Sequence, residues 1–213
     1  MDQLHKTQAT RRFCNIGVGI LMALTLAGCA GYGTQPAPKE VAATKNYKYI
    51  VGPGDKINFV VWHNPELSEV IPVRPDGKIS TPLVEDMQAA GKTPTQLAHD
   101  LEQALSKYIQ DPVVTVLVTD FVGPYSQQIR VIGQALKPET LQYREHMTVL
   151  DVMIAVGGIT PFAAGNRATI VRKVDGQDVQ FSVRLQDLMR DGDIRANVPM
   201  LPGDILIIPE SYF

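Results

Sequence analysis

The sequence is poor in cysteine and lacks an excess of positive charge. Only Cys14 and Cys29 occur among 213 residues, too few for the disulfide framework that stabilises many small secreted domains. The 20 basic and 22 acidic residues give a formal net charge of −2, and there is no basic tract that would neutralise a phosphate backbone. These absences exclude a disulfide-rich module and predict that nucleic acid is not a partner.

The sequence also lacks a hydrophobic run long enough to span a bilayer. Its uncharged apolar stretch at residues 13–26 follows basic residues at positions 6, 11 and 12, and it is shorter than the roughly 20 residues of a membrane-spanning helix. This pattern predicts a cleaved secretory signal peptide. Leu26-Ala27-Gly28-Cys29 resembles the lipobox of bacterial lipoproteins, which implies a signal peptide of residues 1–28 and a lipidated Cys29. The alternative is an ordinary signal peptide with Cys29 left as a free thiol, which is unusual in an oxidising compartment.

Lipid at Cys29 would suffice as a membrane anchor. Burial of acyl chain contributes roughly 0.8 kcal/mol per CH₂, and two or more chains hold a protein stably. Ala30, rather than an aspartate, follows the cysteine, and by resemblance to enterobacterial lipoproteins this implies transfer to the outer membrane. Residues 30–45 are rich in Ala, Gly, Pro and Thr without periodicity, so residues 29–46 are predicted to be a flexible tether.

The first folded unit is predicted at residues 47–120. Its Gly52-Pro53-Gly54-Asp55 turn separates strands expected at 49–51 and 56–62, the second of which alternates as a half-buried strand does. Trp62 ends that strand; it could stack on a sugar ring, but the pattern favours a place in the core. Pro75-Asp76-Gly77 favours a tight hairpin between residues 70–73 and 78–81.

A helix and a buried strand complete this unit. Thr93 and Gln96 form a capping box and Pro94 suits the first helical position. The apolar face expected for the helix consists of Leu97, Leu101, Leu105 and Tyr108. Residues 113–118 are predicted to be a largely buried strand, so the unit is a small α+β domain.

Four motifs in order carry a resemblance to a known family. They are Tyr49-x-Val51-Gly-Pro-Gly-Asp, then Arg74-Pro-Asp-Gly-Lys, then Ala90-Gly-Lys-Thr-Pro, then Asp111-Pro-x-Val. Together they resemble the polysaccharide export domain of Wza-type outer-membrane exporters, whereas any one alone would predict only a turn.

The second unit is predicted at residues 125–209. Its elements are strands at 127–132 and 140–143, a helix begun at Thr148 and ended by Gly157-Gly158, a hairpin at 169–183, a short helix at 185–189, and the Leu201-Pro202-Gly203-Asp204 turn before a final strand at 205–208. This order is similar to the soluble-ligand-binding β-grasp (SLBB) repeat. Pro138-Glu139 and Val156-Gly157-Gly158 depart from the usual Pro-Gly and Ala-Gly-Gly, and the Pro-Glu-Ser-Tyr-Phe ending resembles exosortase-associated exopolysaccharide exporters.

No enzyme signature is present. Glu85 and Asp86, and Asp191 and Asp193, are local carboxylate pairs, but they are expected in solvated loops rather than across a glycosidic bond. The histidines of the mature chain are scattered without metal-ligand spacing: His63, His99 and His146. The sequence therefore predicts no catalytic residues, no metal and no cofactor.

The resemblance implies an α+β lipoprotein that assembles into a homo-oligomeric ring, anchored in the outer membrane and facing the periplasm. The ring's lumen would pass polysaccharide passively, with an inner-membrane copolymerase, or chain-length regulator, docked below. Only residues 209–213 follow the last expected strand, so we expect Cys29 to supply the anchor and a separate outer-membrane protein to complete the channel. The alternatives are a monomeric glycan-binding lipoprotein and a periplasmic glycan hydrolase.

Overall fold

The computed structural model describes residues 34–38 and 47–211. The elements named below belong to one compact unit, residues 35–213. Two clusters of buried hydrophobic residues divide it into a first lobe, residues 49–121, and a second lobe, residues 125–211 together with the strand at Gln35–Pro36. Helices and strands are mixed in both lobes, which confirms the α+β fold class.

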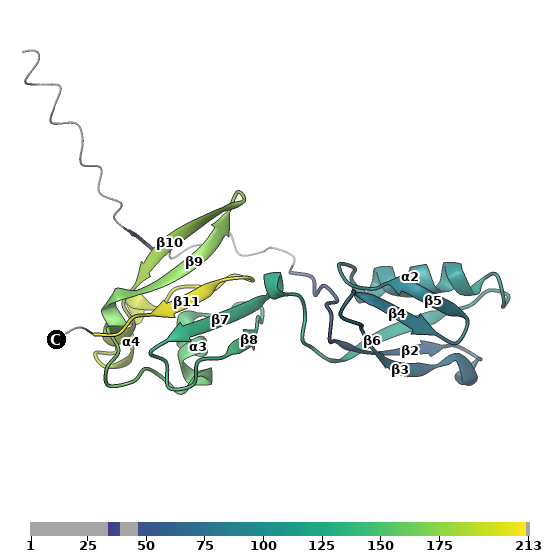
Figure 1. The fold of residues 1–213 in the computed structure, drawn as a ribbon, viewed down its shortest axis with the longest axis horizontal. Coiled ribbons are helices and arrows are strands. Elements are labelled where there is room, and N and C mark those ends of the chain that lie inside the picture. The colour runs from purple at the N-terminus through teal and green to yellow at the C-terminus, as the bar shows by residue number, and fades with distance from the viewer. Residues whose placement is uncertain (1–33, 39–46, 212–213) are drawn as a thin grey trace, which may run out of the picture. The chain divides into compact units, whose positions relative to one another are not determined.

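The first lobe contains a three-stranded antiparallel sheet, a hairpin and a helix (Figure 1). The sheet has the order β3-β2-β6. The elements are β2 (Lys56–Val61), the 3-10 turn η2 (Pro65–Leu67), β3 (Glu69–Pro72), β4 (Lys78–Thr81), β5 (Val84–Gln88), α2 (Pro94–Leu105) and β6 (Val114–Asp120).

The helix α2 begins where its capping box predicts. The Gln96 N–H donates to Thr93 Oγ1 at 3.2 Å, and the Thr93 N–H donates to Gln96 Oε1 at 2.9 Å. The predicted leucines of its apolar face are buried against the sheet: Leu97, Leu101 and Leu105. Tyr108 was expected with them, but the helix ends at Leu105 and the Tyr108 side chain is exposed.

The strand predicted at residues 49–51 does not form. Two further predictions about strands of the first lobe are wrong. Residues 69–72 pair with β2, whereas residues 78–81 pair with β5, so the turn at Pro75-Asp76-Gly77 joins two different sheets instead of closing a hairpin. The strand β6 is not largely buried, because only Val114 of its seven residues lies in the core. Both errors concern the choice of a distant partner, which the local pattern does not encode.

The second lobe is built on a six-stranded mixed sheet in the order β1-β10-β9-β11-β7-β8. Its strands are β1 (Gln35–Pro36), β7 (Gln128–Gly133), β8 (Thr140–Gln142), β9 (Ala168–Val174), β10 (Gln177–Val183) and β11 (Ile205–Ile208). Its helices are α3 (Val149–Ala155) and α4 (Leu185–Met189), with 3-10 turns η3 (Tyr125–Gln127), η4 (Gly165–Arg167) and η5 (Ile194–Ala196).

Local patterns predicted most of this lobe. The β9–β10 hairpin, which stands out from the sheet in Figure 1, pairs from Gln177↔Val174 to Val183↔Ala168. The helix α4 and the strand β11 have the predicted bounds. The strand β11 pairs parallel to β7 and antiparallel to β9, and so brings the end of the chain into the centre of the sheet.

The N-terminal segment is described only in part. Within the predicted tether, Gln35–Pro36 pairs parallel with β10. The proposed signal peptide and Cys29 lie outside the described residues. In the described part of the chain, no helix is both long enough and apolar enough to span a membrane.

Candidate functional site

The first family-motif turn, Gly52-Pro53-Gly54-Asp55, surrounds a fully buried carboxylate. Asp55 Oδ2 accepts from the Gly52 N–H at 2.8 Å and from the Tyr49 hydroxyl at 2.6 Å. Asp55 Oδ1 accepts from the backbone N–H groups of Val122 at 2.7 Å and Gly123 at 2.6 Å. Three backbone groups and a hydroxyl thus satisfy a buried charge, and two of them belong to the segment that leads out of the first lobe.

Tyr49 and Gly52 fit this arrangement for separate reasons. Burial, followed by the hydrogen bond to Asp55, raises the pKa of Tyr49 above its ordinary value, so the hydroxyl remains a donor. A Cβ on Gly52 would lie 2.3 Å from the Gly123 carbonyl carbon and from the Pro124 nitrogen, so no larger residue fits without backbone movement. The turn and the outgoing segment are therefore packed backbone to backbone.

The Leu201-Pro202-Gly203-Asp204 turn repeats this geometry in the second lobe with a different partner. Asp204 Oδ2 accepts from the Leu201 N–H at 2.8 Å, as Asp55 does from Gly52. Arg172 donates to both oxygens of Asp204, at 2.9 Å from Nε and 2.7 Å from a terminal nitrogen. The side chains of this ion pair are 6% and 1% exposed, and the Arg172 guanidinium lies 5.7 Å from the centre of the Phe181 ring.

The remaining motif residues lie in a surface turn, in which Gly77 itself is buried, or in the turn that ends α3. At the surface, the Arg74 guanidinium donates hydrogen bonds to both Asp76 and Asp86. Gly77 has a φ of 79°. Gly157 and Gly158 follow α3 with φ values of 77° and 96°, and the Gly158 N–H donates to the Met153 carbonyl. All of these contacts stabilise turns, and none presents a reactive group.

The two carboxylate pairs do not form an acid–base site. Glu85 and Asp86 lie in β5, not in the loop that was expected, and both are exposed. The hydrogen bond from Arg74 lowers the pKa of Asp86, and that from Arg195 lowers the pKa of Asp193. A general acid in glycoside hydrolysis needs a raised pKa instead.

The histidines are also apart from one another. The His99 side chain is 72% exposed on α2 beside Glu102, and His63 and His146 each have a positive φ. Among the described residues, no three His, Cys, Asp or Glu side chains are placed to hold a metal ion.

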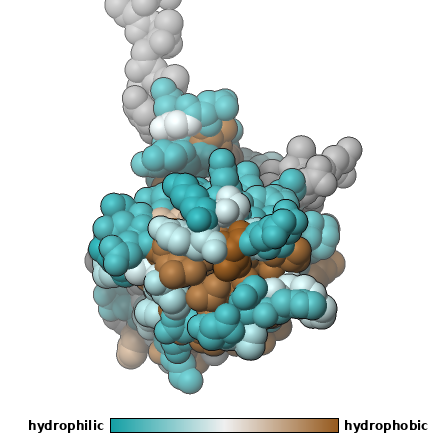
Figure 2. Space-filling model, turned by 90° about the vertical axis from the view of Figure 1, so that its right-hand side faces the viewer, coloured by the Kyte–Doolittle hydropathy of each residue, from teal (hydrophilic) through white to brown (hydrophobic). Residues whose placement is uncertain are grey.

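Trp62 is not in the core, contrary to the prediction that the pattern favoured. It is 66% exposed, continues the outward-facing side of β2, and its ring centre lies 5.1 Å from that of His63. The outward side of the β3-β2-β6 sheet carries further exposed hydrophobic side chains, and we call this set the outer sheet face: Val60, Trp62, Val70, Val113 and Leu117. Figure 2, which views the end of the first lobe, shows hydrophobic side chains exposed inside a hydrophilic rim.

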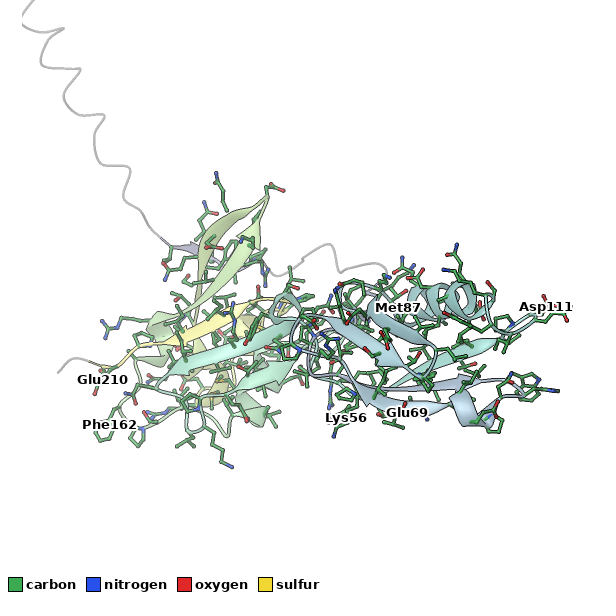
Figure 3. All side chains as sticks on the ribbon, turned by 45° about the vertical axis from the view of Figure 1, so that its right-hand side comes forward. Lys56, Glu69, Met87, Asp111, Phe162 and Glu210 are labelled. Carbon is green, nitrogen blue, oxygen red and sulfur yellow. The ribbon has the colours of Figure 1, made fainter. Side chains whose placement is uncertain are left out.

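The edge of this face is charged. Lys56 points away from the ribbon in Figure 3 and forms an ion pair with Asp120 at 3.4 Å. Neither this pair nor the hydrophobic face was singled out by sequence reasoning. The available signal was a single apolar residue on the otherwise polar side of each strand, Val60 in β2 and Leu117 in β6, followed by Trp62 at the end of β2.

Comparison with known proteins shows what the first lobe resembles. Residues 43–119 match the family described as "Polysaccharide biosynthesis/export protein". The EPS I polysaccharide export outer membrane protein EpsA of Ralstonia nicotianae is 26% identical over an alignment of 188 residues, and the match covers 76% of this chain and 47% of that protein. The capsule polysaccharide export outer membrane protein CtrA of Neisseria meningitidis serogroup B is 30% identical over 137 residues, 62% of this chain and 34% of that protein.

The chain therefore spans less than half the length of these curated relatives. The four motifs that carry the resemblance begin at Tyr49 and end near residue 114, within the matched range. Residues 43–119 are thus similar to the polysaccharide biosynthesis/export family, and the resemblance to Wza-type exporters is confirmed.

Proposed function

We propose that this protein is an outer-membrane component of a polysaccharide export channel, for exopolysaccharide or capsule. The observation that carries the proposal is the match of residues 43–119 to the export family, together with the names of the relatives. Its role is that of a transport component rather than a catalyst. The buried carboxylates of the two motif turns, Asp55 and Asp204, accept hydrogen bonds that stabilise the fold. This agrees with a role in transport.

The proposed anchor is lipid at Cys29, with the folded part facing the periplasm. The support is the Leu26-Ala27-Gly28-Cys29 motif and the following Ala30. Cys29→Ser should move the protein from the outer-membrane fraction to the soluble periplasmic fraction and abolish incorporation of labelled fatty acid. Unchanged fractionation of Cys29→Ser would refute the anchor without touching the export role.

The proposed assembly is a homo-oligomeric ring whose lumen conducts polymer passively, with an inner-membrane copolymerase as partner. The support for self-assembly is the outer sheet face, because hydrophobic side chains exposed together on one side of a sheet mark interaction surfaces. Tryptophan, the residue at position 62, is among the residue types enriched at interface hot spots. A second copy of this chain is the occupant to which we commit.

Trp62→Ser tests the assembly. Loss of a hot-spot side chain costs about 2 kcal/mol or more, which is roughly 30-fold in association, so the variant should shift from oligomer to monomer in sedimentation analysis in mild detergent. Tyr108→Ser is the matched control, since Tyr108 is exposed but lies outside the outer sheet face. Equal assembly of the two variants would exclude this face as the interface.

The decisive test of the whole proposal is genetic. Deletion of the protein should abolish surface polysaccharide, and the wild-type chain should restore it. The alternative, a monomeric glycan-binding periplasmic lipoprotein, predicts a monomer at every concentration and surface polysaccharide that survives deletion.

A further inference from the structure

Two adjacent hollows lie on either side of the chain at residues 142–145. The first has a volume of about 630 Å³ and the second about 540 Å³. They share Gln142, Arg144 and Glu145 in their walls. All of the lining residues belong to the compact unit of residues 35–213. Because the hollows adjoin at the shared residues, we call the two together the track.

The first hollow has an aromatic wall. Tyr47 contacts Tyr143 edge to face, with ring centres 5.1 Å apart, and Tyr49 contacts Phe121 in the same way at 5.2 Å. The hydroxyl of Tyr47 donates to Gln127 and that of Tyr49 to Asp55. Because both hydroxyls already have hydrogen-bond partners, these tyrosines can contact a ligand only through their rings.

The groups shared by the two hollows are polar and have few partners. Gln142 Nε2 is buried and makes no hydrogen bond within the described residues, although a buried amide donor left unpaired is costly. Glu145 Oε1 lies 3.9 Å from His146 Nε2, too far for a hydrogen bond. A donor and a carboxylate acceptor are therefore available between the hollows.

The second hollow has an apolar floor. Leu141, Met147 and Ala155 line it, and the Ile154 side chain beside them is 71% exposed. The buried side of α3 consists of Val149, Val152 and Met153, and Ile154 lies outside it. The helix thus presents a large hydrophobic side chain at a concave surface.

The chemistry of this track matches a sugar chain. Pyranose rings carry apolar C–H faces, which pack on aromatic and aliphatic surfaces, and equatorial hydroxyls, which need both donors and carboxylate acceptors. A phosphate-rich ligand would need several cations, whereas Arg144 is the one arginine or lysine in the walls of both hollows. Two neighbouring hollows suit several linked rings better than one.

We propose that this track binds a short run of pyranose rings of the exported polysaccharide. The inference rests on the proposed export function and adds the residues that touch the polymer. Binding is weak, with a dissociation constant on the order of 1 mM, since a chain that must slide cannot be held tightly. Phe121 supplies the exposed ring, Gln142 the donor and Glu145 the acceptor.

The test uses the mature full-length protein in mild detergent and, as probe, oligosaccharides from partial acid hydrolysis of the source strain's own surface polysaccharide. Calorimetric or NMR titration should give saturable binding by the wild-type protein. Phe121→Ala and Glu145→Gln should each weaken binding at least fivefold. Phe162→Ala is the matched control, because Phe162 is 58% exposed and points outward near Glu210, away from both hollows (Figure 3).

The outcomes separate this inference from the proposed function. Absence of saturable binding, or equal binding by the Phe121→Ala and Phe162→Ala variants, overturns the track even if deletion of the protein abolishes surface polysaccharide. Unchanged surface polysaccharide after deletion overturns the export role, whatever the titration shows. Thermal unfolding of each variant verifies that lost binding is not lost folding.

Discussion

The two lobes use the same four-residue turn to bury an aspartate, yet they satisfy its charge in opposite ways. Asp55 and Asp204 are both 0% exposed, and each accepts from the N–H three residues before it at 2.8 Å. The other donors to Asp55 are neutral, whereas those to Asp204 belong to the Arg172 guanidinium. The local turn is therefore independent of how the charge is compensated.

The difference assigns the two turns different structural roles. Asp55 is bonded to Val122 and Gly123, 67 and 68 residues away, and so fixes the segment that leaves the first lobe. Asp204 is bonded to a side chain of β9 within its own sheet, and so locks the start of β11. The turn at Asp55 therefore orients the segment between the two lobes, whereas the turn at Asp204 stabilises the sheet of the second lobe.

The largest effect is expected at Asp204. Asp204→Ala leaves the Arg172 guanidinium buried without its counter-charge, and removal of one partner of a buried ion pair costs about 3–5 kcal/mol. Urea unfolding should show this loss in the second lobe. Arg172→Met combined with Asp204→Asn removes both charges and should recover most of the stability. If the double variant instead loses as much as Arg172→Met and Asp204→Asn together, each measured singly, the charges are not coupled.

A smaller and differently located effect is expected at Asp55. Asp55→Ala leaves the Gly52, Val122 and Gly123 N–H groups without acceptors, at about 1–3 kcal/mol for an unsatisfied buried group. Val122 is 41% exposed, so water can replace part of the loss, and we expect a total of about 2–3 kcal/mol.

Amide hydrogen exchange provides the comparison between the two turns. It should accelerate at Val122 and Gly123 in Asp55→Ala but remain unchanged there in Asp204→Ala. Asp76→Ala is the control, because Asp76 occupies an exposed turn and its loss should cost less than about 0.5 kcal/mol. Equal acceleration in the two buried-aspartate variants would contradict the separate roles.

The same contrast explains what could be predicted from sequence. The capping box of α2, the β9–β10 hairpin and the strand β11 depend on residues close together in the chain, and all were predicted. The turns at Asp55 and Asp204 were predicted for the same reason. Their partners were not, since Val122 and Arg172 are 67 and 32 residues distant.

The errors have the same origin. The Asp76-Gly77 turn is local, but whether β3 pairs with β4 or with β2 is decided by the rest of the lobe. Trp62 and Leu117 are apolar, yet the side of the sheet on which they lie has no covering layer among the described residues. Hydrophobicity predicted burial there, and exposure is instead what makes this face a candidate interface.

The smallest expected effect is a difference between the two lobes in how the stability of a helix N-terminus depends on pH. Both α2 and α3 begin with a capping box, in which the N–H of the threonine donates to an oxygen three residues later: Gln96 Oε1 at 2.9 Å and Asp151 Oδ2 at 2.8 Å. Only the second box is titratable. The hydroxyl and the N–H of Thr148 lower the pKa of Asp151 below its ordinary value.

The sign of the pH dependence follows from this depressed pKa. The contribution of Asp151 to stability is complete above the unfolded value of about 3.9 and is lost as the pH falls through the folded pKa. Acid should therefore loosen the first turn of α3, by less than about 1 kcal/mol, while the cap of α2 is unaffected. NMR titration of the Thr93 and Thr148 amides measures both at once. Asp151→Asn should abolish the Thr148 response, and a parallel shift of the two amides would show that acid acts on the whole fold.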